Sequence, residues 1–301
     1  MEQALSEHGW NARYHPHPGR DIRGWLRLAP LVARAHLVYF ISARVDRRSP
    51  QAILAILRRR PTVIHWVGAD VGFALDAWRA GQASQRLIHG ATHLADAPWL
   101  IGELREIGIQ AAYLPMPVPA IAAGEPPPLP ARFRVLVYYP ADPVDRESFD
   151  AETIFRVVDA LPEVSFLLIP SPPETLPAPM PPNLEARGWI DDMDAVYRET
   201  TVYLRQTVHD GTSFMAIEAL SRGRHVIWAF PVEGAIEARG FEQTISALRD
   251  LVARHEAGTL GLNAEGREAV LRNFDPERLA VELDRRLRGA LKQRPSSGGS
   301  D

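Results

Sequence analysis

Short apolar runs and amphipathic segments alternate along most of the chain. Runs typical of buried strands occur at residues 36–43, 62–67, 134–139, 164–169, 184–188, 202–207 and 225–230. Segments with helical spacing of apolar positions occur at residues 50–60, 96–107, 150–161, 192–199, 245–255, 265–273 and 276–291. Because strands and helices alternate, the pattern predicts an α/β protein with parallel sheets and right-handed crossovers.

A proline-rich stretch at residues 114–130, LPMPVPAIAAGEPPPLP, interrupts this alternation. Proline lacks a backbone N–H and cannot continue a helix or a central strand, so the stretch is predicted to be a linker. We therefore expect an N-terminal domain at residues 1–125 and a C-terminal domain at residues 130–276. A helix at 277–291 and a disordered tail at 292–301 complete the chain. Two Rossmann-like domains of this kind are expected to face each other across a cleft.

Residues 202–228, VYLRQTVHDGTSFMAIEALSRGRHVIW, are the most informative part of the chain. A predicted strand is followed by a turn at His209–Gly211 and by a short helix that Thr212 or Ser213 can cap. In an open parallel sheet, such a helix begins at the carboxyl edge, where ligands bind. Its free N–H groups and positive dipole end suit a phosphate.

Two acidic residues bracket this turn and helix. Asp210 and Glu218 are separated by seven residues, and the helix after them is predicted to bury Phe214, Ile217 and Leu220 and to end at Gly223. As isolated residues, Asp210 would be an ordinary turn former and Glu218 a solvated helix residue. The surrounding strand, turn, helix, glycine and strand favour a ligand-binding interpretation.

The segment resembles the nucleotide-sugar signature of GT-B glycosyltransferases, especially the retaining family 4 (group 1). The matching residues are Asp210, Glu218, Ala219, Leu220, Gly223, Val226 and Ile227. The resemblance implies that Glu218 holds the ribose hydroxyls of a nucleotide and that Asp210 faces the sugar. It further implies that the amides of Gly211, Thr212, Ser213 and Phe214 meet the diphosphate, and that Trp189 and Ile190 flank the nucleobase. Trp189 is equally well explained as a packing residue.

The similarity extends into the N-terminal half. Residues 63–70, VIHWVGAD, resemble the family's strand that ends in a Gly-x-Asp turn, and residues 87–117 resemble its next helix and strand. His65 and Asp70 lie near the carboxyl end of this strand, so each is a candidate for touching the sugar or the acceptor, with a core or turn role as the alternative. The resemblance covers residues 36–275 and implies a GT-B-like fold.

Two departures from the family pattern stand out. Residues 1–35 offer no first strand with a glycine-rich loop, so the N-terminal domain is predicted to be shortened. The family's Arg and Lys after the first strand of the C-terminal domain are also missing, and Arg146 is the basic residue there. Stabilising a leaving diphosphate would then fall to Arg146, Arg205 and the helix N-terminus at residues 211–214. Alternatively, Arg205 forms a surface or interdomain salt bridge.

Composition narrows the functional classes. The 301 residues are 46% hydrophobic and 24% charged, as in soluble globular proteins, and no apolar run is long enough to span a membrane. The polar N-terminus does not resemble a secretory signal, and the absence of cysteine excludes thiolate metal sites, so a cytoplasmic location is predicted. The net charge of −3 and the lack of a basic stripe with interleaved aromatic residues argue against nucleic-acid binding.

These observations predict a retaining glycosyltransferase that uses a nucleotide-diphosphate sugar as donor, without a cofactor or a metal ion. The acceptor is not identified by the sequence, and peripheral membrane contact stays open. One alternative is a non-catalytic GT-B-like protein that binds another glycosyltransferase as a scaffold, and a less favoured one is a nucleotide-sugar epimerase.

Overall fold

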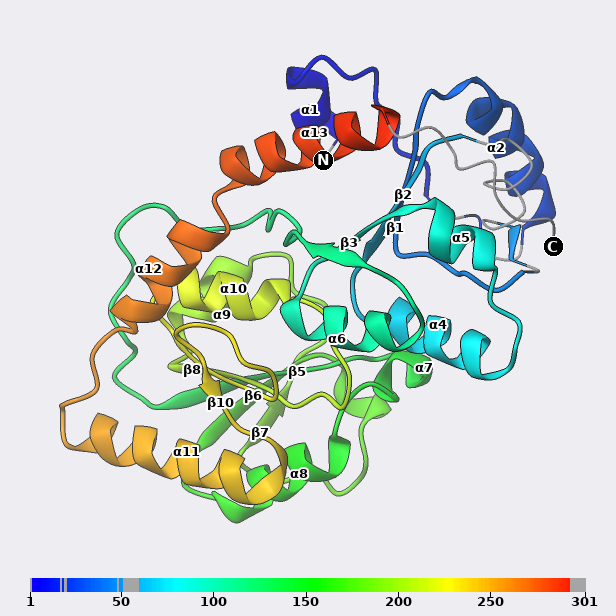
Figure 1. Ribbon diagram of the computed structural model, residues 1–301. Helices are drawn as coiled ribbons and strands as arrows, with labels where there is room; N and C mark the ends of the chain where they lie inside the picture. Colours follow the sequence, from blue (N-terminus) through cyan, green and yellow to red (C-terminus); the bar gives the residue numbers. More distant parts are fainter. Residues whose placement is uncertain (1, 17, 19–20, 48, 51–59, 293–301) are drawn as a thin grey trace. The chain divides into compact units, whose positions relative to one another are not determined.

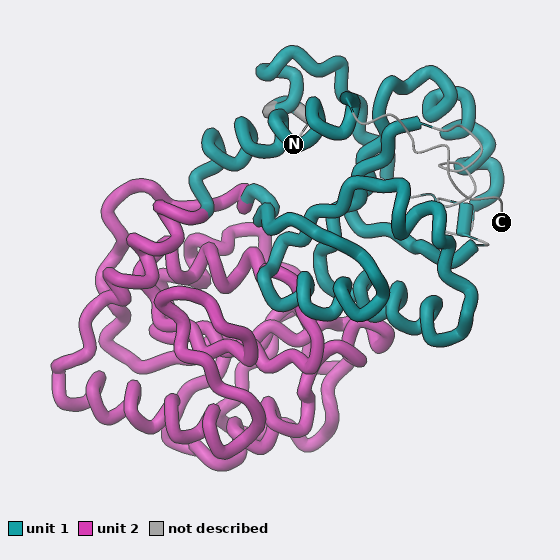
Figure 2. The backbone as a smooth tube through the Cα atoms, in the orientation of Figure 1, with its two compact units in different colours: residues 1–117, 274–301 teal, residues 118–273 magenta. Residues whose placement is uncertain are grey.

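The computed structural model describes residues 2–16, 18, 21–47, 49–50 and 60–292, drawn as the coloured ribbon in Figure 1. The chain forms two compact units, which Figure 2 distinguishes by colour. Unit 1 consists of residues 1–117 and 274–301, and unit 2 of residues 118–273. Each unit contains a parallel β-sheet, so the predicted α/β class is confirmed.

Unit 1 is built on a four-stranded sheet whose strands follow one another in chain order. The strands are β1 (Val38–Ile41), β2 (Thr62–Trp66), β3 (Thr92–Ala95) and β4 (Ala111–Tyr113). Helices α4 (Ala69–Arg79), α5 (Gln85–Gly90) and α6 (Pro98–Glu106) connect them. Ile64 and Trp66 of β2 and Leu100 and Leu104 of α6 are fully buried in its core, because strand and helix present their apolar positions to one another.

Both ends of the described chain pack in unit 1. The helices are α1 (Glu2–Glu7), α2 (Ile22–Arg34) and α13 (Pro276–Lys292). Leu279, Leu283 and Leu287 of α13 pack in one apolar cluster with Val63 and Leu94 of the sheet. The described residues before β1 contain helices and no strand, as predicted, and α13 belongs to the same unit although it follows unit 2 in sequence.

Unit 2 is built on a six-stranded parallel sheet with the order β10-β9-β8-β5-β6-β7. The strands are β5 (Arg134–Tyr139), β6 (Ser165–Pro170), β7 (Leu184–Ala186), β8 (Val202–Arg205), β9 (His225–Trp228) and β10 (Ile236–Glu237). The chain runs outward from β5 to β7, then returns to the other side of β5 and runs outward from β8 to β10. This is the doubly wound Rossmann order, and its topological switch point lies between β5 and β8.

The connections of unit 2 are mainly helical. They are α7 (Pro143–Arg146), α8 (Ala151–Ala160), the 3-10 turn Pro173–Thr175, α9 (Met193–Arg198), α10 (Phe214–Ser221), α11 (Gly240–Glu256) and α12 (Ala264–Asn273). The strands of this sheet are almost entirely buried because helices cover both of its faces, as parallel sheets require.

The predicted strands and helices of unit 2 are all present, each within a few residues of its expected bounds. One feature differs from expectation. Phe214 was predicted to be buried with Ile217 and Leu220, but it is exposed because it is the first residue of α10 and faces outward. The predicted helix at residues 50–60 and the predicted tail at 292–301 fall largely outside the described residues.

None of the helices in the described part of the chain is long and apolar enough to cross a lipid bilayer.

Candidate functional site

Arg205, Asp210 and the turn before α10 lie at the carboxyl edge of the unit 2 sheet, beside the switch point, because β8 ends there. There the loop after β5 is joined to the loop after β8 by a bridge between Phe149 and Thr207. The backbone N–H of Val208 donates a hydrogen bond to the carbonyl oxygen of Ser148 over 3.0 Å. The backbone N–H of Asp150, the residue after Phe149, donates one over 3.1 Å to a carbonyl oxygen of the segment that follows β8. The two loops are therefore hydrogen-bonded to each other at the sheet edge where α/β proteins bind ligands.

At the same edge, Arg205 and Asp210 form a bidentate ion pair. The Nε–Oδ2 distance is 2.5 Å and the Nη2–Oδ1 distance is 3.0 Å. Thr207 Oγ1 donates a further hydrogen bond to Asp210 Oδ2 over 3.1 Å. The two side chains are only 13% and 12% exposed, and the guanidinium lies 5.1 Å from the centre of the Phe149 ring. Each charge is thus largely neutralised by the other. The pair is largely buried and lies within unit 2, so it is neither a surface nor an interdomain salt bridge.

The turn and the helix after Asp210 have the predicted geometry. Ser213 is the N-cap of α10, and its hydroxyl accepts a hydrogen bond from Ala216 N over 3.3 Å. Gly211 and Ser213 are buried, Thr212 is half-buried, and Gly223 ends the helix region with a φ of +67°. The first amides of a helix have no partner within the helix, so the N-terminus of α10 offers N–H donors and a positive dipole end at this edge.

Glu218 lies one turn further along α10 and is half-buried. Tyr197 of α9, itself buried, donates its hydroxyl hydrogen to Glu218 Oε2 over 3.0 Å. Burial raises the pKa of Glu218, although the hydrogen bond from Tyr197 acts in the opposite direction. Only one carboxylate oxygen is engaged in this contact, so the other is available to accept a hydrogen bond from a bound hydroxyl.

Replacing Glu218 by glutamine is expected to stabilise the ligand-free protein at neutral pH. A carboxyl group whose pKa is raised by folding binds protons more tightly in the folded state, so stability falls as the pH rises through its pKa. Glutamine keeps an acceptor for Tyr197 but carries no charge to desolvate. The thermal midpoint of Glu218→Gln at pH 7 should be at or above that of the wild type. The difference should shrink at pH 4, and a midpoint clearly below wild type at pH 7 would contradict this expectation.

Arg146 lies at the carboxyl ends of β5 and β6. Its Nε donates to Pro140 O over 2.7 Å, its Nη1 to Thr175 O over 3.0 Å, and its Nη2 to Ser171 Oγ over 3.3 Å. The guanidinium also lies 4.8 Å from the Tyr139 ring centre. All of these partners are uncharged, and Arg146 has no carboxylate partner among the described residues. Its positive charge is therefore held in place without being neutralised.

Trp189 and Ile190 lie in the loop after β7. The Trp189 side chain is 79% exposed, and its Nε1 donates to Asp191 Oδ1 over 2.8 Å. Ile190 is half-buried. A packing role for Trp189 is thus not what the structure shows, since a large indole that is mostly in solvent contributes little to a core.

His65 lies in unit 1, at the centre of the sheet and 1% exposed. Its Nε2 lies 2.7 Å from the carbonyl oxygen of Leu114, and its Nδ1 lies 2.7 Å from the Tyr39 hydroxyl. A carbonyl only accepts, so Nε2 carries the proton and Nδ1 accepts from Tyr39. Burial lowers the pKa of His65 to about 4, and both ring nitrogens are used within the core. Asp70, the other candidate of this strand end, is also buried and accepts from Val67 N over 3.0 Å.

Lowering the pH from 6.5 to 4 is expected to destabilise unit 1. Burial lowers the pKa of both His65 and His93 from 6.5 to about 4, so the unfolded state binds more protons in this window. Each of these pKa shifts changes the free energy of unfolding by about 3 kcal/mol over the window. Burial raises the pKa of Asp70 to about 6, and this shift changes the free energy in the opposite direction, so it offsets the effect of one histidine. Hydrogen-exchange protection of β2 should therefore fall by about 3 kcal/mol on acidification. His93→Gln should remove much of this slope, and an unchanged slope would contradict the assignment.

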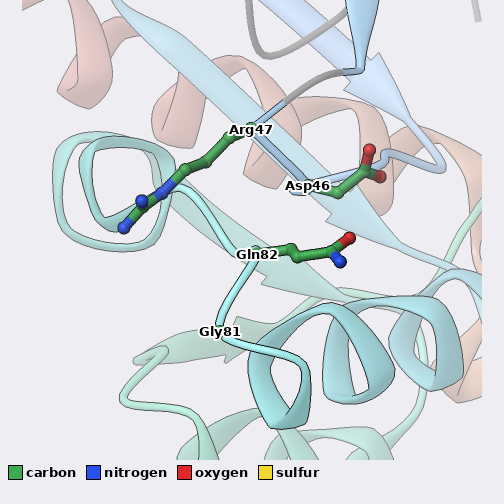
Figure 3. A pocket seen from close by; sticks show the side chains of 4 residues that line it. All are labelled: Asp46, Arg47, Gly81 and Gln82. Atoms are coloured by element: carbon green, nitrogen blue, oxygen red, sulfur yellow. The ribbon is translucent and has the colours of Figure 1, made fainter.

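Unit 1 also contains a pocket of about 220 Å³. Asp46, Arg47, Gly81 and Gln82 line it, and Figure 3 shows the Arg47 side chain pointing away from Asp46 and Gln82. Because Arg47 Nε donates to the Ala83 carbonyl over 3.2 Å, this cation belongs to the packing between two loops. None of the candidate residues predicted from the sequence lines the pocket.

Comparison with solved structures identifies the fold. Similar chains include HepE of Anabaena in complex with UDP-glucose (12% identity, 88% of this chain and 82% of that chain, TM-score 0.66). The sucrose-phosphate synthase of Thermosynechococcus elongatus is also similar (15% identity, 95% and 90% coverage, TM-score 0.69). A glycosyltransferase of Rickettsia africae ESF-5 is a third (11% identity, 97% and 88% coverage, TM-score 0.63). No protein-family model matches the chain, and no curated protein matches it in sequence.

The predicted fold class is confirmed by these neighbours together with the two parallel sheets: the chain has a GT-B-like fold. At 8–15% identity the likeness concerns the fold alone. Assignment to family 4 stays a prediction.

Proposed function

We propose that this protein is a glycosyltransferase whose donor is a nucleotide-diphosphate sugar bound at the carboxyl edge of unit 2. The observation that carries the proposal is the placement of Glu218. It is a half-buried carboxylate with a raised pKa, oriented by a buried tyrosine, and it lies on the helix that begins beside the switch point. A carboxylate kept partly desolvated at a ligand-binding edge is typical of a binding site and costs the folded protein stability. HepE, a structural neighbour, was solved with UDP-glucose.

In this proposal each part of the edge recognises one part of the donor. Glu218 accepts hydrogen bonds from the ribose hydroxyls, and the N-terminal amides of α10 bind the diphosphate. Asp210, held by Arg205, accepts from the sugar hydroxyls. The exposed indole of Trp189, next to Ile190, supplies an aromatic surface for the nucleobase.

The charge that develops on the leaving diphosphate needs a positive partner. Arg205 is committed to Asp210, whereas Arg146 carries a charge that no carboxylate of the described chain neutralises. We therefore assign the larger electrostatic contribution to Arg146 and to the dipole of α10. Transfer with retention, in which the donor phosphate takes the acceptor's proton, requires no protein base. Both ring nitrogens of His65 are bonded within the core, so no step is assigned to it.

The Arg205–Asp210 pair also favours a second candidate function. If the burial of this pair keeps both side chains out of reach of a donor, the chain would be a non-catalytic scaffold that binds another glycosyltransferase. Such a protein would bind nucleotides weakly and form a stable complex with its partner.

Thermal shifts with UDP, GDP and ADP and with their glucose or mannose conjugates test the proposal. A ligand at about 100 times its dissociation constant stabilises the folded protein by about 2.7 kcal/mol, which is a readily measured shift. We expect one base to be selected and its sugar conjugate to bind. The scaffold function is supported instead if none of these nucleotides shifts the midpoint of a well-folded protein.

A further inference from the structure

Helix α2 (Ile22–Arg34) is amphipathic, yet none of its residues is buried. Helices of globular proteins normally bury their apolar stripe against the core. Here Ile22 is 74% exposed, Leu26 is 68% exposed and Leu31 is 40% exposed. A helix that leaves this much apolar surface in water has a surface suited to a partner. Figure 1 shows α2 before β1 in the chain, and both belong to unit 1.

The charged residues of the same helix are all positive. Arg23, Arg27 and Arg34 are exposed, and the helix contains no acidic residue. Asp21, which precedes it, is the N-cap and accepts a hydrogen bond from Arg23 N over 2.9 Å. None of the three guanidinium groups has an ion-pair partner among the described residues.

At 100° per residue, the three arginines fall within one narrow sector of the helix. Leu26 lies about 60° and Ile22 about 100° to one side of that sector, and Leu31 lies about 40° to its other side. Exposed apolar side chains that flank a row of arginines match the boundary of a bilayer. Acyl chains would accept the apolar groups there, while phosphates would meet the guanidinium groups.

The stretch of sequence that contains the helix has a charge complementary to an anionic surface. Residues 13–60 contain eleven arginines and two aspartates, a net charge of +9 in a chain whose total is −3. The positive charge is therefore concentrated in the part of the chain that includes α2, and the rest of the chain is acidic. Such a separation favours adsorption of this part to anionic lipid headgroups.

We propose that α2 docks the protein peripherally on a membrane rich in anionic phospholipid, with Ile22 and Leu26 inserted and Arg23, Arg27 and Arg34 on the headgroup phosphates. A nucleic acid would satisfy the arginines but would leave the two aliphatic side chains in water, so a lipid surface accounts for both observations. The docking does not depend on the proposed glycosyl transfer, because vesicle binding is measured without a donor.

The absence of cysteine permits a site-specific test of insertion. Leu26→Cys and Val281→Cys would each be labelled with an environment-sensitive fluorophore, Val281 being 56% exposed on α13 of the same unit. On vesicles of equal parts phosphatidylcholine and phosphatidylglycerol, the label at position 26 should brighten and shift to the blue, and the label at position 281 should not. Absence of a change at position 26, or equal changes at both positions, would overturn insertion of α2.

Co-sedimentation with the same vesicles tests the charges. Arg23→Gln combined with Arg27→Gln should weaken binding about 30-fold, equivalent to about 2 kcal/mol. Arg79→Gln combined with Arg105→Gln removes two exposed arginines elsewhere in unit 1 and should have little effect. Matched melting curves would confirm that the variants fold. The proposal would be contradicted if the protein bound vesicles of pure phosphatidylcholine equally well. It would also be contradicted if the protein bound RNA but not the anionic vesicles, and the α2 variants abolished that RNA binding.

Discussion

Replacing Glu218 by alanine is expected to weaken binding of the donor nucleotide about 100-fold. A hydrogen bond to a charged group is worth about 1.5–3 kcal/mol, and the ribose offers two hydroxyls to this carboxylate. The truncation also removes the partner of the Tyr197 hydroxyl. Because Glu218 is half-buried and its ionised form is destabilised by its surroundings, the fold should tolerate the change better than the ligand does.

Isothermal titration with the nucleotide selected in the thermal-shift panel would measure this loss. Glu268→Ala is the matched control, since it removes an exposed glutamate from α12 in the same unit and should leave the affinity unchanged. Glu218→Gln should lose nearly as much affinity as the alanine variant without losing stability. If Glu218→Ala bound the nucleotide as tightly as the wild type, the site proposed at α10 would be wrong.

Replacing Arg205 by methionine is expected to destabilise unit 2 by about 3–5 kcal/mol. The Asp210 side chain is only 12% exposed, and the substitution removes its guanidinium partner. The hydrogen bond that Thr207 donates to this carboxylate stays. Removing one partner of a buried ion pair leaves an uncompensated charge, which costs far more than the pair contributes as a whole. The stacking of Arg205 on Phe149, which joins the two loops, would also be lost.

Chemical denaturation of Arg205→Met, Asp210→Asn and the double variant would measure the coupling. The double variant should be more stable than Arg205→Met alone, because no buried charge then lacks a partner. Arg198→Met is a suitable control, since Arg198 is 56% exposed and lies 3.9 Å from Asp192, so its loss should change stability by less than about 0.5 kcal/mol. Additive effects of the two substitutions would show that the ion pair is not formed in solution.

The sequence predicted the core of unit 2 well because there the local pattern and the tertiary environment agree. The apolar runs at 134–139 and 202–207 are strands at the centre of the sheet, and Ser213 caps α10 as its position suggested. Unit 1 was harder to predict. Strand β3 contains Thr92 and His93, and the buried His93 accepts a hydrogen bond from Trp66 Nε1 over 3.1 Å and donates one to the Ile88 carbonyl over 3.0 Å. No local sequence pattern predicts such contacts.

The site itself was only partly predictable for the same reason. Tyr197 orients Glu218 from 21 residues upstream, and nothing in its own surroundings in the sequence marks it as a site residue. The sequence left open a surface or interdomain salt bridge for Arg205, whereas its buried pairing with Asp210 beside Phe149 depends on a loop from another strand. The amphipathic pattern of α2 is legible in the sequence, whereas its exposure is a property of the folded unit.

Hydrogen–deuterium exchange, with and without UDP-glucose, GDP-mannose or ADP-glucose, tests most directly whether unit 2 binds a nucleotide-diphosphate sugar. With the sugar nucleotide that binds, protection should appear at residues 209–218, where the amides at the start of α10 and the turn before it would contact the diphosphate and sugar. Protection should be absent from the unit 1 pocket around Asp46 and Gln82. Binding that protected unit 1 but left residues 209–218 unchanged, or no protection with any of the three ligands, would contradict the proposed donor site.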